Sequence, residues 1–245
     1  MQNLNTAIAE PILDHNNRNE ITRHMVKIKI NSIDSVTHDV LRIKTGKPFR
    51  YTFTPGQATE VSINKAGWQD ERRPFTFTSL PDDDYLEFTI KIYPVHKGVT
   101  NQLLQLKKDD KLIVHEVFGT ISYKGEGVFI AGGAGVTPFI AIFKQLKAIN
   151  RIGNNKLICA NKTKADIILK DYFTNILGSN FINILSGEKT DNYEHGHVSE
   201  DFLLKHISGI NQKFYICGPD PMMEAVEKQL LNLKIDPQLI VKERF

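Results

Sequence analysis

Apolar and polar residues alternate along the first half of the chain, from Met25 to about Tyr123, which is the period of strands with one buried face. Turn signals such as Pro55-Gly56 and Pro81-Asp82-Asp83 separate the alternating runs. Six short, half-polar strands predict a small antiparallel β-barrel over residues 25–122. The runs are Val26/Ile28/Ile30, Leu41/Ile43, Val61/Ile63, Phe75/Phe77, Leu86/Phe88/Ile90/Ile92 and Leu112/Ile113/Val114. One helix is expected within the barrel, over residues 101–106, with the Thr100 hydroxyl as its cap.

The pattern changes after Gly125-Glu126-Gly127 to apolar runs that alternate with helical segments. This rhythm predicts a parallel five-stranded sheet flanked by helices on both faces, over residues 123–245. The expected strands are 128–131, 157–160, 181–185, 214–217 and 239–241, with helices from Pro138, Lys164, about Glu200 and about Pro221. Thr163 with Asp166, and Ser199, are predicted helix caps. The fold class is therefore two-domain, β followed by α/β, and the Asn-rich residues 1–24 are expected to form a flexible extension.

Composition and charge exclude several classes of protein. The 245 residues are 41% hydrophobic and carry a net charge of +3 without a long run of one sign, so nucleic acid is not an expected partner. No apolar stretch approaches the ~20 residues of a membrane span, and the N-terminus lacks a basic head followed by an apolar run. We expect a soluble, cytoplasmic protein whose two cysteines, Cys159 and Cys217, are reduced thiols at the ends of buried strands.

A glycine cluster, Gly132-Gly133-Ala134-Gly135, lies between the strand at 128–131 and Pro138. Gly133 and Gly135 are expected to take positive φ and let backbone N–H groups approach a pyrophosphate, while Pro138 suits the first turn of an amphipathic helix. Strand-to-helix connections also need glycines for geometry alone, so the cluster by itself is weak evidence. A second turn at a strand end, Cys217-Gly218-Pro219, makes a nucleotide-binding cleft the better interpretation.

The barrel half contains Arg73-Pro74-Phe75-Thr76-Phe77-Thr78-Ser79. Alternation places Phe75, Phe77 and Ser79 on one face, and Thr76 and Thr78 on the other. That second face suits a planar heterocycle with a phosphate tail, which Arg73 would pair bidentately. A solvated polar strand face is the alternative. Gly98-Val99-Thr100 before the short helix is a second candidate phosphate site, or simply a capped helix.

Six motifs occur in the order seen in the ferredoxin–NADP reductase superfamily, which residues 25–245 resemble. They are Pro55-Gly56-Gln57, Arg73-Pro74-Phe75-Thr76, Gly98-Val99-Thr100, Gly133-Ala134-Gly135-Val136-Thr137-Pro138, Cys217-Gly218-Pro219 and Glu243-Arg244-Phe245. The resemblance implies a flavin on the barrel, FAD rather than FMN, and a nicotinamide dinucleotide on the second domain. It also implies hydride transfer across the cleft between the two domains.

The resemblance gives the barrel residues the following roles. Arg73, beside Pro74, would neutralise the flavin phosphates, Phe75 would lie against the isoalloxazine ring, and Thr76 would hydrogen-bond near its N5. Many relatives have serine in place of Thr76, which keeps a hydroxyl, and tyrosine in place of Phe75, whose phenolic hydroxyl is lost here. The remaining flavin contacts would come from the pyrophosphate-binding Gly98, Val99 and Thr100, and from Lys91 and Tyr93 at the flavin tail or adenine.

In the second domain the resemblance assigns the dinucleotide pyrophosphate to Gly133, Gly135, Thr137 and Pro138. Cys217, followed by Gly218 and Pro219, would lie near the nicotinamide C4, although a small buried residue ending a strand is the alternative. Glu243 would be an acid near the flavin. Phe245 would be a terminal aromatic that covers the flavin, or else a packing anchor.

Two further segments bear on ligand choice. Lys162 and Lys164 follow the second strand of the sheet without an acid, which favours the 2′-phosphate of NADPH over NADH unless both lysines are simply solvated. His195-Gly196-His197 lacks a third ligand in the sequence and is expected to be a surface turn, so no metal site is predicted.

The expected function is that of an NAD(P)H-dependent flavoprotein reductase passing electrons through FAD to a separate acceptor, with ferredoxin or flavodoxin as the first choice. Neither cysteine belongs to a Cys-x-x-Cys cluster, so the chain is not expected to hold an iron–sulfur centre. The alternatives are an oxygenase reductase component or a reductase of free flavin or ferric chelates. A non-catalytic flavin-binding relay subunit is the alternative from a different class.

Overall fold

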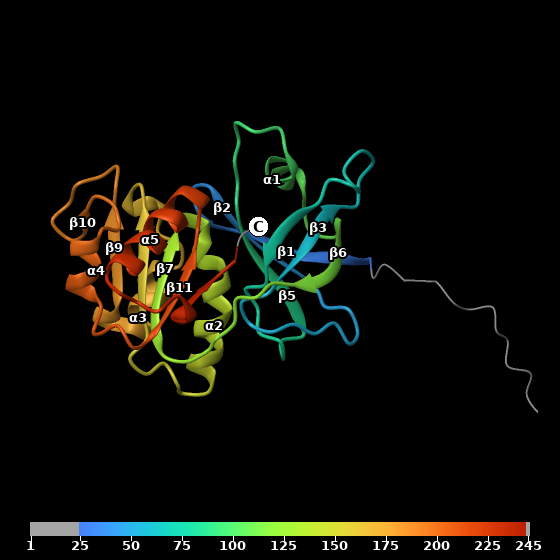
Figure 1. The fold of residues 1–245 in the computed structure, drawn as a ribbon. Coiled ribbons are helices and arrows are strands. Elements are labelled where there is room, and N and C mark those ends of the chain that lie inside the picture. The colour runs from blue at the N-terminus through green and yellow to red at the C-terminus, as the bar shows by residue number, and fades with distance from the viewer. Residues whose placement is uncertain (1–24, 244–245) are drawn as a thin grey trace, which may run out of the picture.

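The computed structural model describes residues 25–243, which form two lobes side by side (Figure 1). The first lobe is a six-stranded antiparallel sheet in the order β4-β3-β6-β1-β2-β5. Its strands are β1 (Val26–Thr37), β2 (Val40–Gly46), β3 (Ala58–Ile63), β4 (Arg73–Thr76), β5 (Tyr85–Lys91) and β6 (Lys111–Phe118). An antiparallel bridge between Phe77 and Phe88 joins the end of β4 to β5, so the two edge strands meet and the sheet closes. The predicted six-stranded antiparallel barrel is confirmed.

The helix within the barrel starts earlier than the sequence predicted. Helix α1 spans Val99–Gln102 and continues as the 3-10 turn η1 (Leu103–Gln105). Gly98 is the N-cap residue and no side chain caps the helix, so the predicted Thr100 cap is wrong. Val99 and Leu103 are each only 1% exposed, so the helix starts at a residue that is buried in the barrel, in keeping with tertiary packing as the main source of helix stability.

The second lobe is built on a parallel sheet in the order β10-β9-β8-β7-β11-β12. Its strands are β7 (Gly127–Gly132), β8 (Lys156–Asn161), β9 (Phe181–Leu185), β10 (Glu194–His195), β11 (Lys213–Cys217) and β12 (Ile240–Lys242). The five predicted strands are all present, and β10 is a sixth that the sequence missed. Because β10 has only two residues, no apolar alternation announces it. His195 accordingly lies in a strand paired with β9, not in the predicted surface turn.

Helices cover both faces of this sheet, as predicted. Helices α2 (Thr137–Ala148) and α3 (Lys170–Leu177) pack in one apolar cluster, and α4 (Glu200–His206) and α5 (Asp220–Asn232) pack in another. Ser199 caps α4 by accepting a hydrogen bond from the Phe202 N–H at 3.2 Å, as expected. The remaining 3-10 turns are η2 (Gly133–Val136), η3 (Lys164–Asp166), η4 (Gly178–Asn180) and η5 (Pro237–Leu239).

The predicted helix from Lys164 is only the turn η3, and the regular helix α3 begins at Lys170. The predicted capping box is present, because Asp166 accepts hydrogen bonds from both the backbone N–H and the hydroxyl of Thr163. Leu169 has φ +51°, which breaks the helical path between η3 and α3.

Helix α2 lies between the sheet and the barrel (Figure 1). Its six consecutive residues 138–143 are all buried, so the predicted amphipathic pattern is limited to the second half, where Lys147 is exposed and Leu146 is buried. A helix that is apolar on nearly every side must be covered on nearly every side. Here the sheet covers one side, and Val40 and Ile121 from the barrel half join the same apolar cluster.

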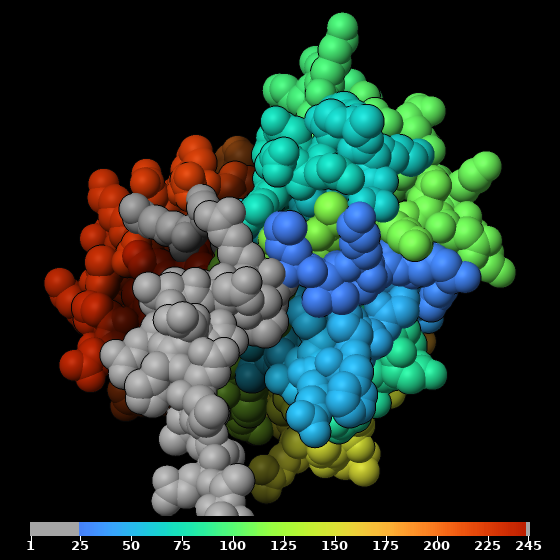
Figure 2. All heavy atoms as spheres, turned by 90° about the vertical axis from the view of Figure 1, so that its right-hand side faces the viewer, coloured from blue at the N-terminus to red at the C-terminus, as the bar shows by residue number. Residues whose placement is uncertain are grey.

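The predicted domain boundary at 122/123 falls in the connection between β6 and β7, and the prediction for residues 1–24 lies outside the described residues. In the space-filling view from the barrel side, the blue start of β1 lies at the surface beside cyan and green barrel segments (Figure 2). Within residues 25–243, no helix is long and apolar enough to cross a membrane.

Candidate functional site

The glycine turn η2 connects β7 to α2, as the sequence predicted. Gly133 has φ +52°, and the Thr137 hydroxyl donates a hydrogen bond to the Ala134 carbonyl at 3.0 Å. Gly135 does not have positive φ, so that part of the prediction is wrong. Its need for glycine is instead a close approach, because a Cβ there would lie 2.1 Å from the Cys217 carbonyl oxygen. Only a residue without a side chain lets this turn touch the end of β11.

The second turn, Cys217-Gly218-Pro219, interlocks with the first. Cys217 ends β11 and pairs with Ala131 of β7, so both turns leave the same carboxyl edge of the sheet. A Cβ on Gly218 would lie 3.0 Å from the Gly132 Cα. Strand exits at the carboxyl edge of a parallel sheet form the crevice in which α/β folds bind ligands. The structure brings the two predicted glycine motifs together at this edge of the sheet. This edge is where the fold places a ligand crevice, and it is called the crevice below.

Glu243 joins this crevice from the segment after β12. Its Oε1 accepts a hydrogen bond from the Thr120 N–H at 3.0 Å, which anchors it beside the exit of β6 in the barrel. Its Oε2 is buried and has no hydrogen-bond partner among residues 25–243. A buried carboxylate oxygen without a donor is costly, so this atom is suited to a donor brought by a ligand.

Glu243 acts electrostatically on Cys217. Burial raises the pKa of the Cys217 thiol to about 12, and the charge of Glu243 acts in the same direction. Cys217 is therefore a neutral thiol at physiological pH. Such a side chain offers a small, polarisable surface and not a nucleophile.

Strand β4 brings the predicted flavin-binding residues to the barrel side of the same region. Thr76 pairs with Ala58, which pairs with Phe118 of β6, just before the Thr120 that holds Glu243. Thr76 is 9% exposed. The shared strands thus bring Thr76 and Glu243 toward one region from opposite ends of the chain.

The other residues of the Arg73-to-Ser79 segment divide into two groups. Arg73 and Pro74 are exposed, and the Arg73 guanidinium lies 3.7 Å from the Glu71 carboxylate. Phe75 is half-buried against the barrel core. Thr78 is fully buried, so the expectation that it faces a ligand is wrong. Its hydroxyl donates a hydrogen bond to Glu87 at 2.9 Å.

The residues predicted to contact the flavin tail differ in exposure and in whether they already have partners. Tyr93 is 47% exposed, and a side chain on Gly98 would meet nothing within 4 Å. Lys91 is engaged, because its ammonium lies 2.7 Å from Asp39 and 3.8 Å from Asp166 of the second lobe. Burial works to raise the pKa of Asp39, but hydrogen bonds from Lys91 and Thr37 and nearby positive charge leave it lowered. If Lys91 contacts the flavin, its ammonium must do so while it remains paired with Asp39 and Asp166.

An acid lies beside the predicted lysine pair, which the sequence did not reveal. The Glu188 carboxylate accepts a hydrogen bond from the Lys164 N–H at 2.8 Å and lies 3.5 Å from the Lys164 ammonium. Lys162 is exposed. Glu188 follows the exit of β9, and the Lys162 carbonyl accepts a hydrogen bond from the Gly187 N–H at 2.8 Å. The available signal was a third glycine-containing strand exit, Ser186-Gly187, at the same edge of the sheet.

Gly119 and Thr120 are also residues of the site that sequence reasoning missed. A Cβ on Gly119, whose φ is +114°, would lie 3.1 Å from Glu243 Oε2. The available signal was a Gly-Thr pair directly after the last barrel strand. Phe245, the predicted terminal aromatic, lies outside the described residues.

The described residues fit a dinucleotide on one side of the crevice and a flavin on the other. Gly135 leaves a cradle at the strand exits that a Cβ would fill, and Gly133 exposes backbone without a side chain. On the barrel side, Arg73 presents an exposed guanidinium and Glu243 an unpartnered acceptor. Arginine and glycine-turn amides are the groups that proteins use for phosphates.

Two family models match the chain in the expected order. An FAD-binding domain model matches residues 25–137, and an oxidoreductase NAD-binding domain model matches residues 129–228. These matches confirm the predicted FAD and NAD(P) cofactors. The FAD-binding model covers the barrel and continues through β7 to the start of α2, where it overlaps the NAD-binding model.

Known proteins with similar sequences or structures support the same assignment. The chain is 32% identical over 224 residues to NADH-cytochrome b5 reductase 2 from Mycosarcoma maydis, covering 82% of this chain and 63% of that protein. It is 27% identical to the reductase component of propane 2-monooxygenase from Mycolicibacterium smegmatis, covering 82% of this chain and 62% of that protein. A solved ferredoxin NADP⁺ reductase from Neisseria gonorrhoeae superposes with a TM-score of 0.76 at 18% identity, covering 89% of this chain and 98% of that one.

A closed antiparallel barrel followed by a parallel sheet, with glycine turns at the sheet's carboxyl edge, defines a two-domain flavin- and nicotinamide-binding protein. The chain belongs to the ferredoxin–NADP reductase superfamily. It spans less than two thirds of the length of the two curated relatives described above.

Replacing Cys217 by alanine is expected to slow flavin reduction by NAD(P)H and leave FAD binding unchanged, because the thiol fills space at the crevice. A thiol with a pKa of about 12 stays neutral, so the pH dependence of the rate from about pH 6 to about pH 9 should match that of the wild type. Stopped-flow absorbance measures the rate of flavin reduction and its pH dependence. Cys159→Ala, which removes a buried thiol from β8, is the matched control. An unchanged rate in Cys217→Ala would make Cys217 a packing residue only.

Proposed function

We propose that this chain is an NAD(P)H-dependent flavoprotein reductase that passes electrons from NAD(P)H through FAD to a separate acceptor protein. One observation supports this most directly: the exits of β7 and β11, Glu243 and the β4 strand of the barrel meet at one crevice. A protein that only held flavin would have no need for the interlocked glycine turns on the dinucleotide side.

The residues of the crevice divide the work of this reaction. A bound flavin would supply the redox chemistry, accepting a hydride from the dinucleotide and releasing electrons onward. Arg73 would hold phosphate, and Thr76 would offer its hydroxyl to the flavin ring. Gly135 allows the dinucleotide turn to lie against Cys217. Cys217 contributes a small side chain that stays uncharged. The protein contributes distance and orientation, which carry much of the rate in such transfers.

Three classes of electron acceptor fit the proposed reaction. Ferredoxin or flavodoxin is the first choice from the family resemblance. The likeness to a propane 2-monooxygenase reductase component supports the second, an oxygenase system. A reductase of free flavin or ferric chelates is the third. A cytoplasmic location is part of the proposal and is supported by the two buried, unpaired cysteines.

The proposal is tested by anaerobic stopped-flow absorbance of the FAD-loaded protein, mixed with NADPH or with NADH. Rapid bleaching of the visible flavin band is the expected result. A demonstrably bound flavin that neither nucleotide bleaches would overturn the proposal and favour the relay subunit.

Reversing the lysine charges with Lys162→Glu and Lys164→Glu together is expected to lower the preference for NADPH over NADH, because a 2′-phosphate requires cations at this point. The measurement is the ratio of kcat/KM for the two nucleotides. Glu188→Gln should move the ratio the opposite way, since Glu188 partly neutralises Lys164. A ratio that neither change moves would place the 2′-phosphate elsewhere.

A further inference from the structure

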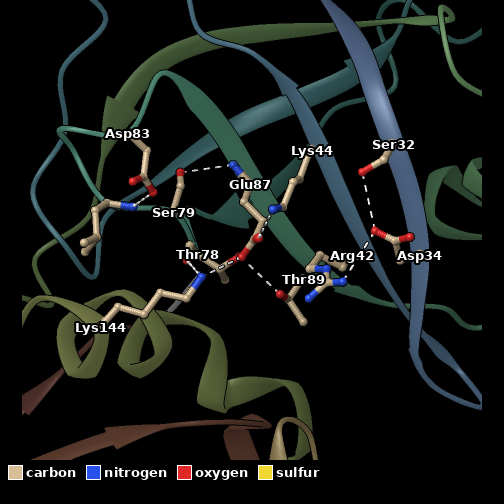
Figure 3. A network of polar contacts seen from close by, with 11 residues as sticks. Ser32, Asp34, Arg42, Lys44, Thr78, Ser79, Asp83, Glu87, Thr89 and Lys144 are labelled. Carbon is tan, nitrogen blue, oxygen red and sulfur yellow. Dashed lines mark hydrogen bonds and ion pairs between the residues drawn. The ribbon is translucent and has the colours of Figure 1, made fainter. Parts of the chain in front are cut away.

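A lysine of α2 reaches out of the second lobe and into the barrel. The Lys144 ammonium donates a hydrogen bond to the Glu87 carboxylate at 2.8 Å and another to the Thr78 carbonyl at 2.6 Å (Figure 3). Lys144 belongs to the helix that begins at the glycine turn, whereas Glu87 and Thr78 belong to the flavin-binding barrel. This contact therefore joins the two cofactor-binding domains directly.

Glu87 is buried on the barrel side of this contact. Its side chain is 5% exposed, and besides Lys144 it accepts a hydrogen bond from the Thr78 hydroxyl at 2.9 Å. Lys44 lies 3.9 Å from its other oxygen, and the Ser79 hydroxyl accepts a hydrogen bond from the Glu87 backbone N–H at 3.0 Å. The Lys144 side chain is 25% exposed, so the carboxylate is the buried partner of the pair. An ion pair with a buried, multiply bonded carboxylate holds its geometry, whereas fully exposed pairs are loosely held.

The position of the contact links the two halves of the crevice. Thr78 lies two residues after Thr76, the residue assigned to the flavin ring, and its backbone N–H donates to the Glu87 carbonyl at 2.7 Å. Lys144 lies two helical turns from Thr137, at the end of the glycine turn. Helix α2 thus links Lys144 to the dinucleotide turn, and the paired segments of the barrel link Glu87 and Thr78 to the flavin-binding strand.

We propose that Lys144, acting through Glu87 and Thr78, is a positioning residue that fixes the distance between the dinucleotide turn and the flavin-binding strand. The proposal rests on the proposed function, because it gives this contact a purpose in hydride transfer between two cofactors. Lys144, Glu87 and Thr78 together are called the clamp, and none of them is among the residues assigned to either cofactor. Its loss should affect the transfer step and not the binding of either cofactor.

The first test measures the domain arrangement and needs no catalysis. Spin labels are placed at Lys108→Cys in the barrel and Lys228→Cys on α5, both exposed positions. Cys159 and Cys217 are buried with pKa values of about 12, which disfavours their labelling. Double electron–electron resonance should give a narrow distance distribution in the otherwise unchanged protein and a broader one after Lys144→Met. An unbroadened distribution would overturn the clamp.

The second test measures transfer. Lys144→Met is expected to lower the rate of flavin reduction at saturating NAD(P)H by at least about tenfold, because small misplacements of reacting groups are costly. The affinities for FAD and the dinucleotide should change by less than about twofold. Lys144→Arg should recover most of the rate. A lowered affinity with an unchanged limiting rate would overturn the positioning role.

Two controls separate the clamp from general damage. Lys147→Met removes an exposed lysine from the same helix, whose ammonium lies over the Tyr172 ring within the second lobe, and should behave as wild type. Glu87→Gln combined with Lys144→Met should be no slower than Lys144→Met alone, because the two residues act as one unit. If the wild type itself is not reduced by NAD(P)H, the proposed function fails, while the distance measurement still decides whether the clamp exists.

Discussion

Gly135→Ala is expected to abolish rapid flavin reduction by NAD(P)H while FAD remains bound to the barrel. The new Cβ would lie 2.1 Å from the Cys217 carbonyl oxygen, 2.4 Å from its carbon and 2.6 Å from the Gly218 nitrogen. All three are backbone atoms, so no side chain can turn aside, and the two strand exits must separate. A displacement of about 1 Å at this point is worth roughly 100-fold in rate. Stopped-flow absorbance with NAD(P)H is the measurement, with the flavin content determined beforehand.

The matched control for Gly135→Ala is Gly46→Ala at the end of β2. A side chain at Gly46 would meet nothing within 4 Å, and the backbone there is not left-handed. Gly135→Ala should also lower the free energy of unfolding by about 1–3 kcal/mol through overpacking, which Gly46→Ala should not do. A Gly135→Ala protein reduced as fast as wild type would show that the two turns need not touch.

The strands of both lobes could be predicted because each has enough residues to show its pattern. The period-two runs of the barrel and the alternation of apolar strands with helices after Gly127 gave all the strands of three or more residues. Strand β10 could not be predicted, since two residues carry no period. The start of α1 also escaped prediction, because it lies at Val99, whose burial is a tertiary effect.

The candidate site could be predicted only where its chemistry lies in a continuous motif. The glycine turns and the Arg73-to-Thr76 segment are local patterns, and the structure places both turns in one crevice. Glu188 lies after a different strand, β9, and contacts Lys164 only in the folded chain. The real requirement at Gly135 is likewise a contact with β11, not a backbone angle of its own.

The burial of Glu87 shows most clearly what one strand's pattern cannot reveal. In β5, Leu86, Phe88 and Ile90 alternate with Glu87 and Thr89, which predicts an apolar inner face and a solvated outer one. The outer face is also buried, because α2 of the second lobe packs against it and Lys144 supplies the compensating charge. Which polar face a neighbouring domain covers depends on the assembly of the two lobes.

Arg73→Ala is expected to raise the dissociation constant for FAD by roughly 10- to 150-fold, because each charge-assisted hydrogen bond to phosphate contributes about 1.5–3 kcal/mol. The Arg73 side chain is 48% exposed and lies 3.7 Å from Glu71, so its removal leaves no buried partner unpaired. The free energy of unfolding of the flavin-free protein should therefore stay within about 0.5 kcal/mol of wild type. Fluorescence titration of the flavin-free protein with FAD measures the dissociation constant.

The neighbouring Arg72 provides the control, because the two arginines differ in what they contact and not in charge. The Arg72 guanidinium is half-buried and donates to the Glu60 carboxylate of β3 at 3.3 Å. The Arg73 guanidinium donates to the exposed Arg72 carbonyl at 2.6 Å and lies 3.7 Å from the exposed Glu71 carboxylate. Arg72→Ala should leave FAD affinity unchanged and lower stability slightly, the reverse of Arg73→Ala. Equal FAD affinity in both variants would mean that the flavin phosphates are held elsewhere on the barrel, with the exposed backbone at Gly98 as the next place to test.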